Sequence, residues 1–298
     1  TLSEGNTAIG SRAADTFVSG SYNIFLGHKS SIAMTSGTYN ISIGRQSLGG
    51  GDYVYGDNSY NTAIGNFALM EASGANYNTA IGFYAMSKTT TGDQNLAIGY
   101  YAGNDNITSS NNVYLGHQAG AKNDSSYNVF IGSEAGEFAT GIVSSVLIGR
   151  QSAGGAVGTG DNNVSIGAGA AYSLTSAHSS VVIGYEAGYY LSTGLENTLM
   201  GFYAGRGITT GDYNTALGHS ALYAGANTGR NTALGYGSMK DYAQSGDGYN
   251  TAVGMYSMFD IETGSANVAV GYNALKGVNG SDNDHNTSIG ADTMYNIN

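Results

Sequence analysis

A short, mostly apolar segment recurs in this chain from one end to the other, and more polar residues separate its copies. Most copies open with Asn and two with Ser. Each continues with a β-branched or aliphatic residue, an uncharged residue and an aliphatic residue or Met, and closes with Gly, as in NTAIG at Asn61–Gly65. Seventeen copies occur, and eleven of the sixteen spacings between their glycines are 17 residues. The β-branched residues and the short length of the segment predict a strand, and the fixed period predicts a solenoid. We number each copy from its closing glycine, position 0, which is Gly10, Gly27, Gly44, Gly65, Gly82, Gly99, Gly116, Gly132, Gly149, Gly167, Gly184, Gly201, Gly218, Gly235, Gly254, Gly271 or Gly290.

Positions −1 and −3 point to one face of each strand and position −2 points to the other, because side chains alternate along a strand. Position −1 is always aliphatic or Met, and position −2 is mostly Ala or Ser and never charged. Two uncharged faces predict that one fills the coil and the other packs on a second chain, and the sequence leaves open which face meets the partner. Ile81→Asp is expected to abolish folding by burying an unpaired charge. The residues assigned to the core are Ile9, Ile64, Ile81, Ile98, Ile131, Ile148 and Ile183.

Two further positions indicate how the coils turn and stack. The opening Asn occurs in fifteen copies and suits a turn, because its side chain bonds to nearby backbone; stacked coils would align these amides into a ladder. Position +3 is Ala in eleven copies, Ser in five and Thr in one, which indicates that backbones approach closely there. The closing glycine is expected to have a positive φ or to face a crowding neighbour. We assign Asn61, Asn78, Gly65 and Gly82 as structural turn residues.

These patterns predict an all-β fold, a parallel β-roll or β-solenoid of about seventeen 17-residue coils. Residues 1–298 form a single repeat domain, in which each coil contains a strand, a tight turn, a second short strand and a polar turn. The chain has no Pro, as expected where nearly every strand N–H is needed in a ladder. Neither end has a polar cap, so we expect the domain to be a segment of a longer fibre protein.

Composition argues against several classes of function. The net charge is −11 and the ten Lys and Arg residues are scattered, so nucleic acid is not an expected partner. There is no Cys, and the five His residues fall in separate coils, so we expect no metal and no cofactor. No apolar run is long enough to insert into a membrane. No acidic pair recurs, and we expect no enzymatic activity.

Aromatic residues provide the strongest indication of binding. The chain has 24 Tyr and eight Phe, and many follow the closing glycine directly, so that rings in consecutive coils can stack into a ladder. Such ladders also stabilise stacked coils, and that structural interpretation is the alternative to binding. Tyr combines a flat apolar face with a polar tip and suits contact with sugars or proteins. The longest insertion, at residues 49–60, contains three tyrosines, of which Tyr53 and Tyr55 are candidates. The candidate glycan or receptor contacts are Tyr53, Tyr55, Phe67, Phe83, Tyr84, Tyr100, Tyr101, Phe202 and Tyr203.

The motif, followed by two variable residues and Ala, resembles the head repeats of trimeric autotransporter adhesins. The segments YNTAIGFYAM at Tyr77–Met86 and NTALGHSALYAG at Asn214–Gly225 look like the NTAIG-type repeats of phage tail fibres. The resemblance covers the whole chain. It implies parallel β-rolls in which three chains surround one axis, so it supports a homotrimeric fibre. The period of 17 is longer than that of typical adhesin heads, which implies larger turn loops.

We therefore expect a structural and adhesive fibre segment, a phage tail fibre shaft or receptor-binding region that attaches to a bacterial cell surface. Its expected partners are its own copies in a homotrimer, a bacterial surface glycan or receptor, and other fibre or tail subunits. Its expected location is a virion tail fibre or the extracellular cell surface. The alternatives are the head of a bacterial trimeric autotransporter adhesin and a glycan depolymerase tailspike. A monomeric ice-binding solenoid is disfavoured, because Thr occupies position −3 in only eight copies.

Overall fold

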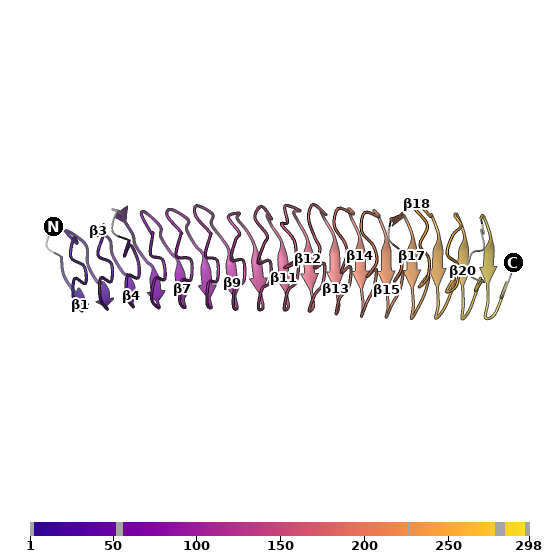
Figure 1. Cartoon of the computed structure of the whole chain (residues 1–298), viewed down its shortest axis with the longest axis horizontal. Coiled ribbons are helices and arrows are strands. Elements are labelled where there is room, and N and C mark those ends of the chain that lie inside the picture. The colour runs from indigo at the N-terminus through magenta and orange to yellow at the C-terminus, as the bar shows by residue number, and fades with distance from the viewer. Residues whose placement is uncertain (1–2, 52–55, 226, 278–283, 296–298) are drawn as a thin grey trace. The chain divides into compact units, whose positions relative to one another are not determined.

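The computed structural model describes residues 3–51, 56–225, 227–277 and 284–295. The chain is an all-β parallel β-solenoid of about sixteen coils, and the described residues contain no helix (Figure 1). Two units can be distinguished, Thr1–Ser144 and Ser145–Asn298. The expectation of a parallel β-solenoid is confirmed.

In the first unit, each copy of the motif forms a three-residue strand at positions −3 to −1 and pairs in parallel with the strand of the next coil. These strands are β1 (Thr7–Ile9), β2 (Ile24–Leu26), β4 (Ile41–Ile43), β6 (Thr62–Ile64), β7 (Thr79–Ile81), β8 (Leu96–Ile98), β9 (Val113–Leu115) and β10 (Val129–Ile131).

The second unit repeats this arrangement, again with parallel pairs in register. Its motif strands are β11 (Val146–Ile148), β12 (Val164–Ile166), β13 (Val181–Ile183), β14 (Thr198–Met200), β15 (Thr215–Leu217), β17 (Thr232–Leu234), β19 (Thr251–Val253), β20 (Val268–Val270) and β21 (Thr287–Ile289).

The second short strand expected in every coil forms at only two places in the described residues. In the first unit β3 (Met34–Ser36) pairs with β5 (Gly56–Asp57), and in the second β16 (Thr228–Gly229) pairs with β18 (Gly246–Asp247). Most of the other described coils pass this region as turns and bends, with hydrogen bonds from each coil to the next.

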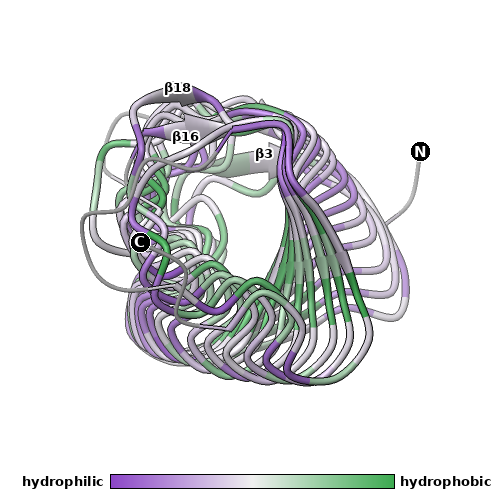
Figure 2. Ribbon diagram, turned by 90° about the vertical axis from the view of Figure 1, so that its right-hand side faces the viewer, coloured by the Kyte–Doolittle hydropathy of each residue, from purple (hydrophilic) through white to green (hydrophobic). Residues whose placement is uncertain are grey.

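The assignment of the seven isoleucines to the core of the coil is wrong. Position −2 points inward, and Ala63, Ala80 and Ala97 are fully buried. Positions −1 and −3 point outward: Ile98 is 40% exposed and Ile9 is 61% exposed. The other isoleucines assigned to the core, Ile64, Ile81, Ile131, Ile148 and Ile183, are only half-buried. Figure 2 shows hydrophobic strand positions repeated from coil to coil. We call the residues at positions −1 and −3 the outer strand face.

A physical reason explains this inversion. The interior of a small coil must also hold the side chains of positions +3 and +4, so it has room mainly for small residues on the strand. The branched side chains of the outer strand face lie in register with the equivalent residues of the coils above and below, as Ile64, Ile81 and Ile98 do. Period-two alternation distinguishes two faces of a strand, but two uncharged faces give no sign of which one is inside.

The expected ladder of asparagine amides is confirmed. The Asn78 side chain is buried, and its Nδ2 donates to Asn61 Oδ1 at 3.3 Å and to the Gly92 carbonyl at 2.8 Å. Its Oδ1 accepts from the Asn95 backbone N–H at 2.9 Å and from Asn95 Nδ2 at 3.1 Å. Each amide therefore satisfies buried polar groups on both neighbouring coils, which explains why the motif opens with Asn.

The closing glycines are required both by backbone conformation and by close approach. Gly82 has a φ of +140°, and a Cβ at this residue would lie 2.3 Å from the Gly99 carbonyl oxygen. The Ala residues at position +3, such as Ala85, are fully buried. Both expectations for these positions are confirmed.

Side-chain volumes at positions −2 and +4 compensate each other within most coils. Ala80 at −2 accompanies Met86 at +4, whereas Leu199 at −2 accompanies Gly205 at +4. All three non-glycine side chains are fully buried. A Cβ on Gly205 would lie 2.6 Å from Cδ2 of Leu199, so the larger strand residue occupies the space that position +4 fills elsewhere.

Candidate functional site

Aromatic rings stack from coil to coil in the first unit. At position +2, Phe67 stacks on Tyr84 with ring centroids 4.6 Å apart, and Tyr84 stacks on Tyr101 at 5.0 Å. At position +1, Phe83 stacks on Tyr100 at 5.7 Å, and Tyr100 stacks on His117 at 5.2 Å. The predicted stacking of these rings is confirmed.

A second set of stacked rings was not among the predicted candidates. Tyr22, Tyr39, Tyr60 and Tyr77 occupy position −5 in four consecutive coils, with successive centroids 5.1, 5.3 and 4.8 Å apart. Each of these side chains is about half exposed. The tyrosine that precedes the motif in YNTAIG is the sequence signal that identifies them.

In the second unit, the candidates Phe202 and Tyr203 lie in one coil, at positions +1 and +2, and contact different sets of rings. Phe202 stacks between Tyr185 at 5.1 Å and His219 at 5.0 Å, and His219 stacks on Tyr236 at 4.9 Å. Tyr203 approaches Tyr223 edge-on at 6.0 Å. The remaining candidates, Tyr53 and Tyr55, lie outside the described residues.

Position +5 of the second unit carries aromatic and cationic side chains in eight consecutive copies of the motif. We call them the aromatic–cation row. Arg206 lies over Tyr189 at 5.2 Å, and Lys240 and Lys276 lie over Phe259 at 5.1 and 5.2 Å. The scattered appearance of the basic residues in the sequence is therefore misleading, because these three align. The row comprises Tyr172, Tyr189, Arg206, Tyr223, Lys240, Phe259, Lys276 and Tyr295.

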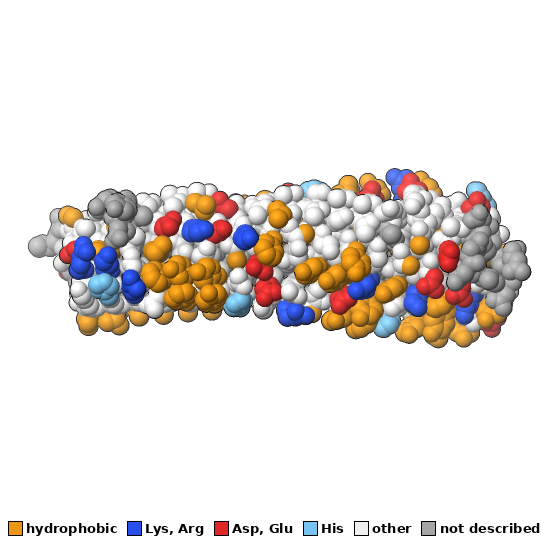
Figure 3. Space-filling model, viewed as in Figure 1, with side chains coloured by type: hydrophobic (Ala, Val, Ile, Leu, Met, Phe, Trp, Pro, Cys, Tyr) orange, Lys and Arg blue, Asp and Glu red, His pale blue; other side chains and the backbone are white. Residues whose placement is uncertain are grey.

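A pocket of about 350 Å³ opens along this row. Tyr223, Lys240 and Phe259 of the row line it, together with Tyr203 and Tyr256 at position +2 and with His219 and Tyr236 at position +1. Tyr236 is 48% exposed. Figure 3 shows hydrophobic side chains gathered beside basic and acidic ones over the C-terminal coils. The pocket therefore offers several aromatic rings and one ammonium group to a ligand.

Arg206, beside this pocket, is held by an internal partner. Its Nε donates to Glu186 Oε2 at 2.8 Å, and its guanidinium lies within 6 Å of four tyrosine rings. Burial alone would raise the pKa of the Glu186 carboxyl, but hydrogen bonds from Arg206 and Tyr185 outweigh it and lower the pKa. The Arg206–Glu186 ion pair remains ionised at neutral pH and links two neighbouring coils.

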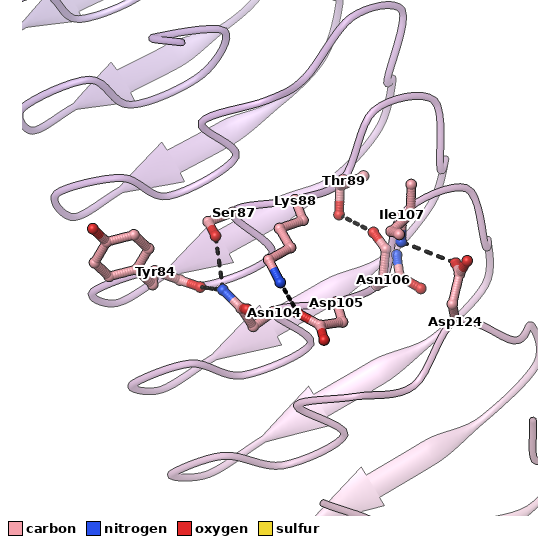
Figure 4. Close-up of polar contacts among 9 residues, drawn as sticks. All are labelled: Tyr84, Ser87, Lys88, Thr89, Asn104, Asp105, Asn106, Ile107 and Asp124. Atoms are coloured by element: carbon pink, nitrogen blue, oxygen red, sulfur yellow. Dashed lines mark hydrogen bonds and ion pairs between the residues drawn. The ribbon is translucent and has the colours of Figure 1, made fainter. Parts of the chain in front are cut away.

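The first unit has a corresponding pocket of about 310 Å³, lined by residues that include Tyr84, Ser87, Lys88 and Asn104. Its polar groups bind one another (Figure 4): Lys88 Nζ lies 2.8 Å from Asp105 Oδ1, and Asn104 Nδ2 donates to Ser87 Oγ at 2.7 Å. The hydrogen bond with Asp105 raises the pKa of the Lys88 ammonium. This pocket has only two aromatic rings, Tyr84 and Tyr101, and its cation is already paired.

Sequence reasoning identified Tyr203 but missed the rest of the second-unit pocket. Tyr223, Lys240 and Phe259 are separated by 17 and 19 residues, and each lies five residues after a closing glycine. Alignment of all copies on that glycine would have revealed this column of aromatic and cationic residues.

Within the described ranges, no group of three or more His, Cys, Asp or Glu residues is arranged to hold a metal ion. The same residues include no helix with the length and apolar character needed to cross a membrane. No protein-family model, curated protein or solved structure matches the chain.

Proposed function

We propose that this chain is a structural and adhesive segment of a fibre. Three copies associate through their outer strand faces, and the assembly attaches to a bacterial cell surface. The observation that carries this proposal is the outer strand face, which is uncharged in all seventeen copies of the motif although the chain has a net charge of −11. Ile98 and Leu217 on this face are 40% and 42% exposed. Extended apolar surfaces of this kind are typical of interaction sites.

The occupant that fits this face best is another copy of the chain. The outer strand face supplies two apolar or Thr side chains per coil, 16 from the eight motif strands of the first unit and 18 from the nine of the second. A stable interface uses roughly 20–30 residues from each partner. Two copies with the same repeat can also keep the same register over many coils.

The resemblance to phage tail fibre repeats and trimeric adhesin heads supports three copies and a location on a virion tail fibre or cell surface. A bacterial surface glycan or receptor is then the attachment partner, and other fibre or tail subunits are the structural partners. Many weak sites on one assembly reinforce each other through their high effective concentration.

The experiment compares two adjacent substitutions by light scattering and circular dichroism. Wild-type protein should have a mass near three times that of the 30.5 kDa chain. Ile81→Asp places a carboxylate on the outer strand face, and we expect a folded monomer. Ala80→Asp places the same charge one residue away in the interior, and we expect the coil to unfold. Val157→Asp, at a residue that is 62% exposed outside the motif strands, is the control and should remain trimeric.

A monomeric wild-type protein contradicts the proposal, as does an Ile81→Asp variant with the full mass. A folded Ala80→Asp variant would instead contradict the assignment of the inner face. The corrected orientation of the strands therefore replaces the earlier expectation that Ile81→Asp abolishes folding.

A further inference from the structure

The second-unit pocket combines two kinds of groups. Tyr203, Tyr223, Tyr236, Tyr256 and Phe259 provide its aromatic surface, and Lys240 provides a cation. The rings come from four consecutive coils, so the surface extends along the solenoid rather than into it. A ligand that fits it is elongated and has flat apolar faces with polar edges.

Sugar rings have this shape and chemistry. The C–H groups on a pyranose face carry partial positive charge, and the face of an aromatic ring is negative, so the two attract each other while the sugar hydroxyls remain in water. Consecutive coils of a parallel β-solenoid lie about 4.8 Å apart. The pocket takes its rings from consecutive coils, and Tyr203 and Tyr223 meet edge-on rather than stacking face to face. An extended glycan chain advances by about the same distance per sugar, so consecutive sugars can meet consecutive coils.

Lys240 indicates the charge of the ligand. Arg206 is paired with Glu186 at 2.8 Å, and Lys276 is paired with Asp260 at 3.8 Å. Among the described residues, no carboxylate lies within ion-pair distance of the Lys240 ammonium group, which lines the pocket beside Phe259. A carboxylate on the ligand would supply that partner.

We propose that this pocket binds an acidic oligosaccharide. Its sugar rings lie on the tyrosine side chains, and one carboxylate binds the ammonium group of Lys240, which Phe259 supports. The inference rests on the proposed adhesive function and assigns it a place on the second unit and a class of ligand. The corresponding first-unit pocket does not share this role, because its lysine is already paired with Asp105.

The test uses the full chain on an array of oligosaccharides that contain glucuronate or galacturonate, each printed beside its neutral glucose or galactose counterpart. We expect wild-type protein to bind acidic members at least tenfold better than the neutral ones. Lys240→Gln should remove this preference, and Tyr223→Ala should weaken binding at least tenfold. Tyr39→Ala removes a stacked tyrosine that is 53% exposed and lies outside the pocket, and it should bind as wild type does.

Three results would overturn the inference: no binding to any member, equal binding to acidic and neutral members, or an unchanged preference in Lys240→Gln. Circular dichroism must show that each variant is folded. Light scattering on the same samples separates the two proposals. Trimers that bind no sugar contradict only the pocket, and monomers that bind acidic sugars contradict only the assembly.

Discussion

The exchange of volume between positions −2 and +4 can be tested by converting one kind of coil into the other. Leu199 and Gly205 in the second unit represent the coils with a large strand residue, and Ala80 and Met86 represent the opposite arrangement. Methionine is compatible with the backbone at position +4, because Met86 has a φ of +46° and Gly205 has a φ of +57°. The variants are Leu199→Ala, Gly205→Met and the double variant.

Each single substitution should be strongly destabilising. Leu199→Ala removes a fully buried side chain and leaves a cavity, which costs about 2–5 kcal/mol. Gly205→Met places a Cβ 2.6 Å from Cδ2 of Leu199 and puts a side chain in the left-handed region. Overpacking and the left-handed conformation together cost roughly 2–5 kcal/mol.

In the double variant the methionine occupies the space that the leucine left. The cost of the left-handed conformation remains, and so does some empty space beside Gly188, whose Cβ would lie 3.0 Å from Cδ1 of Leu199. We therefore expect the double variant to lose about 2 kcal/mol, far less than the sum of the two single losses.

The assay is guanidinium unfolding followed by circular dichroism, combined with hydrogen exchange of the amides in this coil. Hydrogen exchange is needed because coils of a solenoid contact mainly their neighbours and can open locally. A double variant as unstable as the sum of the single variants would refute the compensation. It would show that positions −2 and +4 do not share one space.

Three further predictions concern the closing glycines, the amide ladder and the buried Tyr242. Gly82→Ala should lower the free energy of unfolding by about 3 kcal/mol or more, because it adds a clash to backbone strain. Gly74→Ala is the control and should cost less, because Gly74 has a φ of +105° and no atom lies within 4 Å of the new Cβ. Equal losses of stability in the two variants would contradict the role of close approach. Asn78→Ala leaves buried groups of Asn95 and Gly92 without partners and should lower the free energy of unfolding by about 3 kcal/mol. An unchanged melting temperature would show that the amide ladder is dispensable. Burial raises the pKa of Tyr242 from 10.0 to about 12, so the folded chain holds this proton more tightly than the unfolded chain. The proton on Tyr242 therefore contributes about 2–3 kcal/mol to the free energy of unfolding below pH 10, and this contribution is lost as the pH rises to about 12. Tyr242→Phe should reduce the loss of stability between these two pH values. An identical dependence of stability on pH in the variant would contradict the role of Tyr242.

The sequence by itself determined the repeat and much of its local chemistry. The spacing of the closing glycines predicts parallel strands in successive coils, because a fixed period brings equivalent residues into register. The opening Asn predicts a ladder of amides, and the small residue at position +3 predicts close approach of backbones. Stacking of Phe67, Tyr84 and Tyr101 also follows from the period alone. In each case, the same or a similar residue type at one position of successive copies carries the information.

The tertiary structure decided which face of the strand is inside and which side chains meet between rows. Ile81 and Ala80 are both uncharged, and only the limited volume of the coil places the alanine within and the isoleucine outside. Tyr223, Lys240 and Phe259 share a position in the repeat but not a residue type, so their alignment predicts a row, and the structure shows that the row lines a pocket. The proposed assembly face and the proposed sugar pocket both depend on this three-dimensional packing.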